Sequence, residues 1–190
     1  MHDAPTFRPL ELDAILADAH RAGFAMSCED RTGSLLATLA ASKPGGRFVE
    51  LGSGAGAGSA WLASGMSPDA HLTTVELDPG VQAIARRHLG HDPRIEFVTA
   101  DADTWLTEAT GPFDFAYVDC RPGKYLRLAD LLAILAPGAL YVVDDMLPQA
   151  TWPDDHQPRV DAFMEQLPEV PNVRATPMRW ASGLVVAARV

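Results

Sequence analysis

Apolar residues recur along the chain in two alternating patterns. Runs of five or six mostly apolar residues, typical of buried strands, are followed by stretches in which apolar positions recur every three or four residues, as on one face of a helix. Strands that alternate with helices pair in parallel, so this pattern predicts an α/β fold whose sheet is covered on both faces. The predicted strands are residues 47–51, 72–77, 94–99, 113–118 and 139–143, and the predicted helices between them are residues 57–65, 79–89, 103–108 and 124–135.

Two amphipathic helices are predicted ahead of the first strand, over residues 9–22 and 30–41. No internal repeat or low-complexity linker interrupts the sequence, so we expect one domain over residues 1–190, with N-terminal helices in residues 1–45. The inward face of the first helix is expected to hold Leu10, Leu12, Ile15 and Leu16, and that of the second Leu35, Leu36 and Leu39.

The C-terminal part of the chain breaks the alternation. A loop rich in Pro, Asp and Trp over residues 147–158 precedes a predicted helix over residues 159–167 and two predicted strands over residues 173–180 and 184–190. The turn at residues 181–183 is too short for the crossover that parallel strands need. The last two strands are therefore predicted to form an antiparallel hairpin.

The most informative stretch, residues 48–59, joins the first strand to the helix that follows. A short apolar run ends in Glu50, a glycine occupies every second position from Gly52 to Gly58, and an alanine-rich helix begins. A strand, a glycine turn and a helix N-terminus can hold a nucleotide-like ligand close to the backbone, where a Cβ would intrude. A tight turn with no ligand is the alternative. The candidate contacts here are Glu50, Gly52, Ser53, Gly54, Gly56 and Ser59.

Charges at the strand ends discriminate between possible ligands. Glu50 would repel a pyrophosphate but attract an ammonium or sulfonium group. Glu76, at the end of the second strand, could accept both hydroxyls of a ribose. Asp101, after the third strand, could accept from an adenine amino group or only cap the next helix. Together these features describe S-adenosylmethionine, with Leu77 and Ala102 as its remaining contacts.

The composition narrows the choice of partner. The 190 residues include 25 acidic and 15 basic ones, and the net charge of −10 argues against nucleic acid and acidic membranes. Only two cysteines, Cys28 and Cys120, are present, so neither a zinc site nor a disulfide framework is expected. The N-terminus has no apolar signal core, and no apolar run reaches about 20 residues. The sequence thus predicts a cytoplasmic protein that acts on a small molecule.

With Glu50-Leu51-Gly52-Ser53-Gly54-Ala55-Gly56 and Glu76 in place, the chain resembles class I S-adenosylmethionine-dependent methyltransferases, in particular the catechol and small-molecule O-methyltransferase group. The likeness runs over residues 26–190. Residues 26–33 are similar to the segment that lies over the methionine tail in that group. Val118-Asp119 with Tyr125, and residues 142–147, are similar to its fourth- and fifth-strand motifs.

This resemblance implies a Rossmann-like, doubly wound sheet of seven strands in the order 3-2-1-4-5-7-6, with the last strand antiparallel. It also implies a ligand across the carboxyl ends of the strands, beneath the N-terminal helices. Enzymes of this group are often dimers, so a homodimer is a further expectation. The implied activity is methyl transfer from S-adenosylmethionine to a hydroxyl of a small phenolic or catecholic acceptor.

The group's active site holds a divalent cation on carboxylates and an amide, and the cation chelates the acceptor oxygens. The matching positions here are Asp119, Asp144 and Asp145, which would suit Mg²⁺ or another divalent ion. Asp119 is also expected to contact the cofactor. Asp145 replaces the usual asparagine, and Pro122 replaces a lysine three residues after the first aspartate.

Lys124 is left as the candidate catalytic base, beside Asp119 as the second catalytic residue. A nearby metal and desolvation would favour its neutral amine, whereas three carboxylates without a metal would favour the ammonium. The alternative is a solvated residue at the start of a helix. The residues that could line a pocket for the acceptor are Met146, Trp152, His156 and Trp180. The alternative is that they are ordinary core or interface residues, and for His156 a surface position is expected.

Other functions remain open at this point. A metal-independent methyltransferase of another small molecule fits the cofactor motifs equally well. A nucleic-acid methyltransferase would carry two prolines and an aromatic residue where this chain has Asp119-Cys120-Arg121-Pro122. An NAD-dependent oxidoreductase would account for the G-x-G-x-x-A pattern of residues 52–57. It would account neither for Glu50 nor for the lack of a Tyr-x-x-x-Lys pair. A non-catalytic module that only binds the cofactor also stays open, because Pro122 stands where the group has a lysine.

Overall fold

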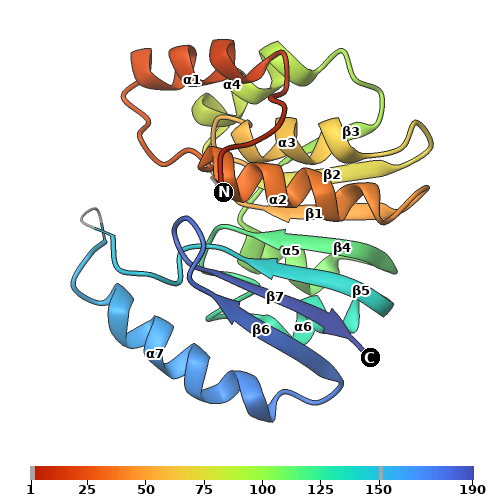
Figure 1. Ribbon diagram of the computed structural model, residues 1–190, viewed down its shortest axis with the longest axis vertical. Helices are drawn as coiled ribbons and strands as arrows, with labels where there is room; N and C mark the ends of the chain where they lie inside the picture. The colour runs from red at the N-terminus through yellow and green to blue at the C-terminus, as the bar shows by residue number, and fades with distance from the viewer. Residues whose placement is uncertain (1–2, 150–151) are drawn as a thin grey trace.

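The alternating elements build one seven-stranded sheet in the computed structural model, which describes residues 3–149 and 152–190 (Figure 1). The strand order is β3-β2-β1-β4-β5-β7-β6, and β7 alone runs antiparallel to its neighbours β5 and β6. This confirms the predicted order and the C-terminal hairpin. The strands are β1 (Arg47–Leu51), β2 (His71–Glu76), β3 (Ile95–Thr99), β4 (Phe113–Val118), β5 (Leu135–Val143), β6 (Val173–Met178) and β7 (Leu184–Arg189).

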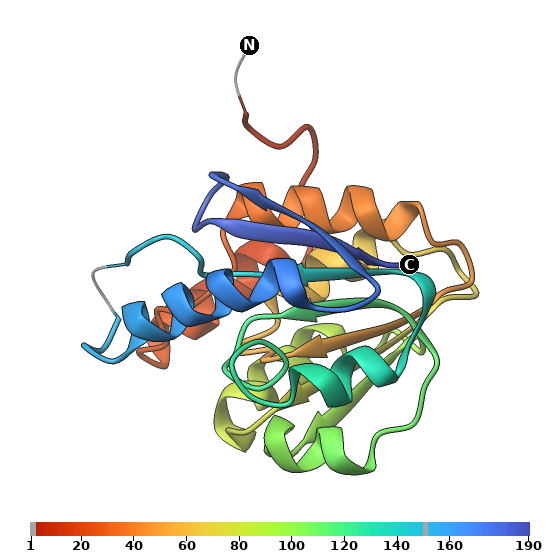
Figure 2. The same ribbon diagram turned by 90° about the horizontal axis from the view of Figure 1, so that it is seen from below.

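Helices cover both faces of the sheet, so that α2 and α5 lie on opposite sides of it (Figure 2). Alternate residues of β1 explain this, since Phe48 packs with α1–α4 and Val49 packs with α5–α7. The helices are α1 (Leu12–Arg21), α2 (Asp30–Ala41), α3 (Ala57–Gly65), α4 (Pro79–Leu89), α5 (Ala102–Glu108), α6 (Leu128–Ala133) and α7 (His156–Gln166), the last continuing into a 3₁₀ turn over Leu167–Glu169.

Two sequence-based expectations about these elements are wrong. The first helix begins at Leu12 and leaves Leu10 94% exposed, because the polypeptide at Leu10 has not yet entered the helix. The predicted helix 124–135 is reduced to α6, since Gly123 and Arg127 have left-handed φ values of 89° and 57° that a helix cannot contain. Residue 135 instead begins β5.

Close contact between α2 and α3 fixes the N-terminal helices on the sheet. A Cβ on Gly65 of α3 would overlap the backbone carbonyl of Ala37 in α2, and a Cβ on Gly33 would overlap the indole of Trp61. Glycine at these two positions therefore allows the helices to pack without a gap. The contact brings the segment that precedes α2, residues 24–29, over the carboxyl ends of the strands.

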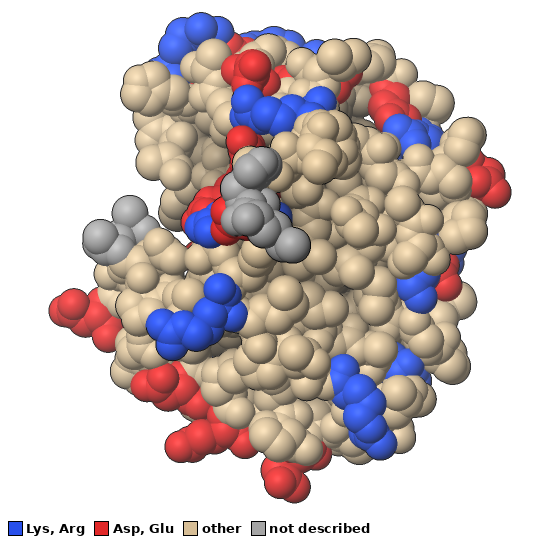
Figure 3. Space-filling model, viewed as in Figure 1, with Lys and Arg blue, Asp and Glu red and all other residues tan. Residues whose placement is uncertain are grey.

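Charged side chains are scattered over the face of the molecule that Figure 3 shows. On the face in Figure 3, lysine and arginine side chains lie apart from one another among acidic ones, with a broad uncharged area between them. Among the described residues, no helix is both long and apolar enough to cross a bilayer.

Gly65→Ala should lower the free energy of unfolding by about 2 kcal/mol, because its methyl group would push α2 off α3. The matched control is Gly80→Ala in the first turn of α4, where the new Cβ would meet only the Asp78 side chain at 3.2 Å. There the change should stay below about 1 kcal/mol, in the stabilising direction. Urea denaturation of both variants measures the difference. Equal effects would mean that the α2–α3 contact is not tight.

Candidate active site

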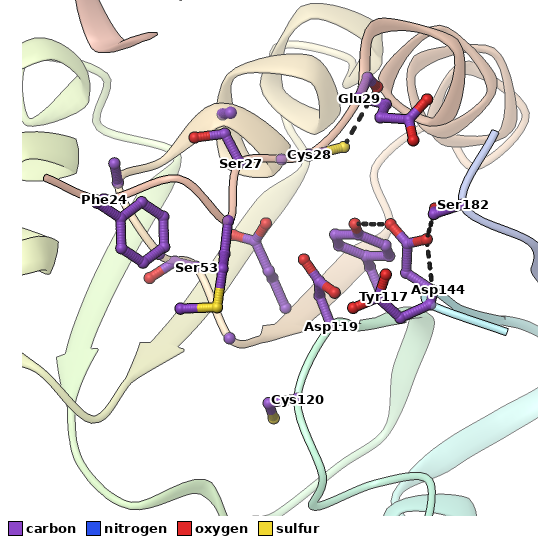
Figure 4. Close-up of a pocket in the computed structure, with 18 of the residues that line it drawn as sticks. Phe24, Ser27, Cys28, Glu29, Ser53, Tyr117, Asp119, Cys120, Asp144 and Ser182 are labelled. Carbon is purple, nitrogen blue, oxygen red and sulfur yellow. Dashed lines mark hydrogen bonds between the residues drawn. The ribbon is translucent and has the colours of Figure 1, made fainter. Parts of the chain in front are cut away.

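A cavity of about 410 Å³ opens at the carboxyl ends of β1, β4 and β5 (Figure 4). The end of β1 and the glycine turn form one side, residues 24–29 form another, and Tyr117, Asp119 and Asp144 lie together opposite Ser53. Its size falls in the range of small-molecule and cofactor sites. A parallel sheet places ligands at this edge, next to the point where the strand order reverses from β1 to β4.

The glycine turn follows β1 so tightly that two of its positions admit no side chain. Gly52 has a φ of 91°, and a Cβ there would lie 3.0 Å from the carbonyl oxygen of Asp119. Gly54 has a φ of 51°, and a Cβ there would lie 2.9 Å from the ring of Phe24. The turn is thus packed between the end of β4 and the segment before α2, which leaves its backbone as part of the cavity wall.

Glu50 presents a fully buried carboxylate to this cavity. Its Oε2 accepts hydrogen bonds from the hydroxyls of Ser59 and Thr74, whereas its Oε1 is buried with no hydrogen-bond partner. Burial raises the pKa of Glu50 to about 7, against the lowering effect of the two hydroxyls. An ionised carboxylate with one unpaired buried oxygen is costly unless a donor reaches it. The Ser53 hydroxyl also lines the cavity and is likewise buried without a partner.

Glu76 fixes the position of the glycine turn. Its Oε2 accepts from the backbone N–H of Gly54 at 2.8 Å, and its Oε1 accepts from that of Asp78 at 3.0 Å. The Glu76 side chain also lines the cavity. Since a carboxylate oxygen can accept more than one hydrogen bond, both oxygens retain capacity for a ligand hydroxyl.

The remaining predicted cofactor residues lie outside the enclosed cavity. Ser59 is behind Glu50, where it orients the carboxylate, and Gly56 packs against Ala85 of α4. Asp101 caps α5 by accepting from the N–H of Asp103 at 2.8 Å, which was the alternative considered for it. Leu77 is 67% exposed and Ala102 is buried in the core on the α5 side of the sheet. Contacts of these residues with a cofactor stay predictions.

A second buried cluster of hydrogen-bonding residues surrounds Asp144, whose own side chain is only 3% exposed. The Tyr117 hydroxyl donates to its Oδ2 at 2.7 Å (Figure 4). The Ser182 hydroxyl and the backbone N–H of Asp145, the latter at 2.7 Å, both donate to its Oδ1. Lys124, also 3% exposed, donates from Nζ to the Asp144 backbone carbonyl at 2.9 Å. The structure therefore brings Asp119, Asp144, Asp145 and Lys124 to one end of the cavity.

The acidic side chains at this end influence one another. Burial, and then the charge of Asp144, raise the pKa of Asp119 well above its ordinary value, while the charge of Lys124 opposes the rise. The same two causes raise the pKa of Asp145. Burial also keeps the nearby Cys28 thiol protonated, since its pKa is raised well above the ordinary value. The charged forms of the carboxylates are thus unfavourable without a positively charged neighbour.

The described residues do not show the divalent-metal site that was predicted at Asp119, Asp144 and Asp145, so a metal there stays a prediction. Both carboxylate oxygens of Asp144 already accept hydrogen bonds from protein donors. The ammonium of Lys124 is held against its carbonyl oxygen. Within residues 3–149 and 152–190, no group of three His, Cys, Asp or Glu side chains is arranged to hold a metal ion. We therefore derive no step through a metal.

Lys124 also differs from its predicted setting. It lies in the turn before α6, not at the start of a helix, and it is buried. Its side chain is absent from the cavity wall, although Asp119, Asp144 and Asp145 are all part of it. Lys124 therefore supports the wall from behind.

Sequence reasoning missed Tyr117, Ser182 and Gln149, all of which line the cavity. Tyr117 had a readable signal, because it lies two residues before Asp119 and on the same face of β4 as the core residue Phe115. Ser182 had none, since only the pairing of β7 with β5 brings the β6–β7 turn to Asp144.

The four residues proposed for an acceptor pocket do not line the enclosed cavity. His156 is buried at the start of α7, so the expectation of a surface position is wrong. Its ring lies 4.2 Å from that of Trp152, and its Nε2 lies 3.2 Å from the Tyr125 hydroxyl. Burial lowers the pKa of His156, and the charge of Lys124 adds to this effect. Trp180 donates from Nε1 to the Arg31 carbonyl at 3.1 Å, which ties the β6–β7 turn to α2.

Comparison with known proteins gives a consistent picture. Residues 49–146 match a protein family described as a methyltransferase domain. The chain is 34% identical over 122 residues to a catechol O-methyltransferase from Mycobacterium tuberculosis, a match that covers 60% of this chain and 54% of that relative. It is 30% identical over 149 residues to a catechol O-methyltransferase from Niastella koreensis, covering 72% and 67%. The chain thus spans about half the length of the first of these relatives.

Solved structures share the whole fold. The crystal structure of TomG, an O-methyltransferase from Streptomyces achromogenes involved in tomaymycin synthesis, in complex with SAM, superposes with a TM-score of 0.83. The two chains are 26% identical, and the match covers 97% of this chain and 91% of that one. The similarity therefore extends beyond the glycine turn to the N-terminal helices and the C-terminal hairpin.

Replacement of Glu50 should change how stability depends on pH in the cofactor-free protein. Because the folded-state pKa of about 7 lies above the ordinary value of 4.5, ionisation of Glu50 destabilises the fold at pH 8, and this penalty fades as the pH falls to 5. Glu50→Gln has no such penalty. Its stability relative to the wild type should therefore decrease by about 2–3 kcal/mol between pH 8 and pH 5. Denaturant unfolding at both pH values measures this, and a constant difference would exclude a strained carboxylate.

Proposed function

The chain belongs to the methyltransferase-domain family of class I, S-adenosylmethionine-dependent enzymes, and from this premise we propose that it methylates a hydroxyl of a small phenolic or catecholic molecule. S-adenosylmethionine, when bound, supplies an activated methyl group and leaves as a neutral thioether. The protein's own residues have to bind this cofactor, hold the acceptor oxygen in line with the methyl group, and exclude water.

One observation carries the cofactor assignment: Glu50 is part of the cavity wall, and its buried Oε1 has no hydrogen-bond partner. The α-ammonium group of an amino-acid tail would supply the donor and the positive charge that this oxygen lacks. A pyrophosphate would place negative charge beside a carboxylate, which disfavours a dinucleotide. The Ser53 hydroxyl offers a second unpaired polar atom for the same ligand.

The N-terminus of α3 complements Glu50. Gly56 precedes this nine-residue helix without a side-chain cap, and Ala57 and Gly58 line the cavity. Free N–H groups and the positive end of the helix dipole favour a carboxylate there. A zwitterionic methionine tail would thus find an acceptor for its ammonium and donors for its carboxylate within one turn of the chain.

The acceptor is expected at the other end of the cavity, next to Asp119 and Asp145. In the transfer, the acceptor oxygen forms a bond to the methyl carbon as the carbon–sulfur bond breaks, and the hydroxyl proton passes to the carboxylate that accepts its hydrogen bond, that of Asp119 or Asp145. Asp119 and Asp145 line this end and can accept a hydrogen bond from the hydroxyl, which aligns its oxygen lone pair. Lys124 is not placed to accept the proton, since Nζ is bonded to Asp144 behind the wall.

The names of the relatives support this acceptor class, because two of them are catechol O-methyltransferases. The bound SAM of the Streptomyces structure supports the cofactor. The cytoplasmic location, the lack of nucleic-acid and membrane partners, and a homodimer stay predictions.

Glu50→Gln should weaken the binding of S-adenosylmethionine and S-adenosylhomocysteine by about 10- to 100-fold at pH 8, because a charged hydrogen bond to the ligand's ammonium group is lost. Adenosine, which has no amino-acid tail, serves as the control ligand and should bind both proteins within about twofold. Calorimetric titration of the three ligands measures this. Equal weakening of adenosine would mean that the substitution disturbs the whole site, and unchanged S-adenosylmethionine binding would contradict the assignment.

The purified protein with S-adenosylmethionine should methylate dihydroxybenzenes and leave their dimethoxy analogues unchanged, because only a free hydroxyl can attack. Formation of S-adenosylhomocysteine and mass spectrometry of the acceptor detect the reaction. A melting temperature that rises with NAD and not with S-adenosylmethionine would refute the proposed function.

A further inference from the structure

The turn between β6 and β7, residues 179–183, contacts two parts of the molecule that lie far apart in the sequence. The Trp180 indole donates from Nε1 to the Arg31 carbonyl oxygen at 3.1 Å. Two residues later, the Ser182 hydroxyl donates to the Asp144 carboxylate (Figure 4). Arg31 lies in the first turn of α2 and Asp144 directly follows β5, so this one turn joins the N-terminal helices to the acceptor end of the cavity.

Arg31 connects Trp180 to the segment that covers the cavity. Its guanidinium lies 5.9 Å from the centre of the Trp180 ring, and its Nη2 lies 3.6 Å from a carboxylate oxygen of Glu29. Glu29 is the last residue of segment 24–29, which lines the cavity along its whole length. The Glu29 carbonyl also accepts from the N–H of Gly33 at 2.9 Å. This end of the segment is therefore positioned by the start of α2, which Trp180 contacts.

Segment 24–29 is held mainly at its two ends. At its start, the N–H of Phe24 donates to the Ala19 carbonyl of α1 at 2.9 Å, and the Phe24 ring packs against Gly54 of the glycine turn. In the described part of the chain, residues 25–28 make no backbone–backbone hydrogen bond. Backbone without such bonds opens at low cost in free energy, so a cofactor that binds beneath this segment can fix its position.

The other side of the β6–β7 turn is closely packed against the loop that follows β5. The N–H of Leu147 donates to the Ser182 carbonyl at 2.8 Å. A Cβ on Gly183, whose φ is 84°, would lie 2.5 Å from the Leu147 nitrogen, so the two chains touch without a gap. The turn thus holds, in addition to Asp144, the start of the loop whose Gln149 lines the cavity.

We propose that Trp180 is a positioning residue for methyl transfer. When the cofactor fixes segment 24–29, the contact of Trp180 with Arg31 fixes the β6–β7 turn, and the turn fixes the acceptor end around Asp144. Trp180 does not line the cavity, so it acts through its neighbours and touches neither ligand. Because the acceptor oxygen must lie in line with the methyl group, a looser acceptor end slows the transfer without weakening the cofactor. This inference rests on the proposed function, since it requires the cofactor to bind beneath segment 24–29.

Hydrogen exchange followed by NMR tests the connection without an acceptor. In the wild type, saturating S-adenosylhomocysteine should slow exchange of the Gly33 amide at the start of α2, and of the Leu147 amide at the acceptor end, by at least about fivefold each. Trp180→Phe keeps an aromatic ring beside Arg31 but loses the N–H donor. In this variant the ligand should still protect Gly33, whereas its protection of Leu147 should fall below about twofold.

Equal protection of Leu147 by the ligand in both proteins would overturn the proposal, because the ligand would then act on the acceptor end without Trp180. Protection of Gly33 alone in the wild type would overturn it as well. A wild type that does not bind S-adenosylhomocysteine would contradict the cofactor assignment itself, so the two failures are distinguishable.

Trp105→Phe is the matched control for the loss of an indole. Trp105 packs against Phe113 on the α5 side of the sheet, with 6.3 Å between ring centres, and its replacement should leave the protection of Gly33 and Leu147 unchanged. Arg31→Met serves if Trp180→Phe does not fold, because it removes the guanidinium from the Trp180 ring. It should reduce the protection of Leu147 by at least about half, and unchanged protection would count against the proposal.

Kinetics with catechol give a readout that a merely structural role would not move. Trp180→Phe should lower kcat/KM for catechol about tenfold and change the KM for S-adenosylmethionine by less than about threefold. Ser182→Ala interrupts the connection at its other end and should act similarly. The double variant should lose no more than about tenfold, because both changes interrupt the same connection. A loss of about 100-fold would mean that the two residues act separately, and would overturn the proposal.

Discussion

A buried carboxylate with one unsatisfied oxygen is the constraint on which the rest of the site depends. Glu50 belongs to the central strand β1, so the sheet itself carries it into the interior, and Ser59 and Thr74 hold only one of its oxygens. The pKa of about 7 records the cost of burying this charge. A cationic ligand removes that cost, and the glycine turn leaves room for such a ligand because its backbone replaces side chains in the wall.

The two ends of the cavity resolve the same electrostatic problem differently. At the Glu50 end, the negative charge is left open and demands a cation from a ligand. At the Asp144 end, three carboxylates are gathered, and an ammonium from the protein itself, that of Lys124, is already present. Under the proposed function, this difference would let one acidic cavity attract a charged cofactor at one end and accept a neutral phenol at the other.

Local patterns predicted the parts of the structure that depend on neighbouring residues. The strands, the glycine turn and Glu50 are contiguous in sequence, so their periodicity and spacing were readable. Residues 124–127 were predicted as the start of a helix over 124–135. They form a turn instead because of distant contacts: the Tyr141 hydroxyl donates to the Gly123 carbonyl, and Lys124 donates to the carbonyl of Asp144, just past the end of β5. The same reason hid Ser182 and the hydrogen bonds that the Asp144 oxygens accept, so the metal site at Asp119, Asp144 and Asp145 was predicted from the family resemblance without them.

The most direct test of the central claim counts protons. Calorimetric titration with S-adenosylmethionine at pH 7, repeated in buffers of different ionisation enthalpy, gives the number of protons released on binding. Because an ammonium beside Glu50 would lower its pKa, the wild type should release about half a proton more than Glu50→Gln. Identical proton release by the two proteins would contradict a cationic ligand at Glu50.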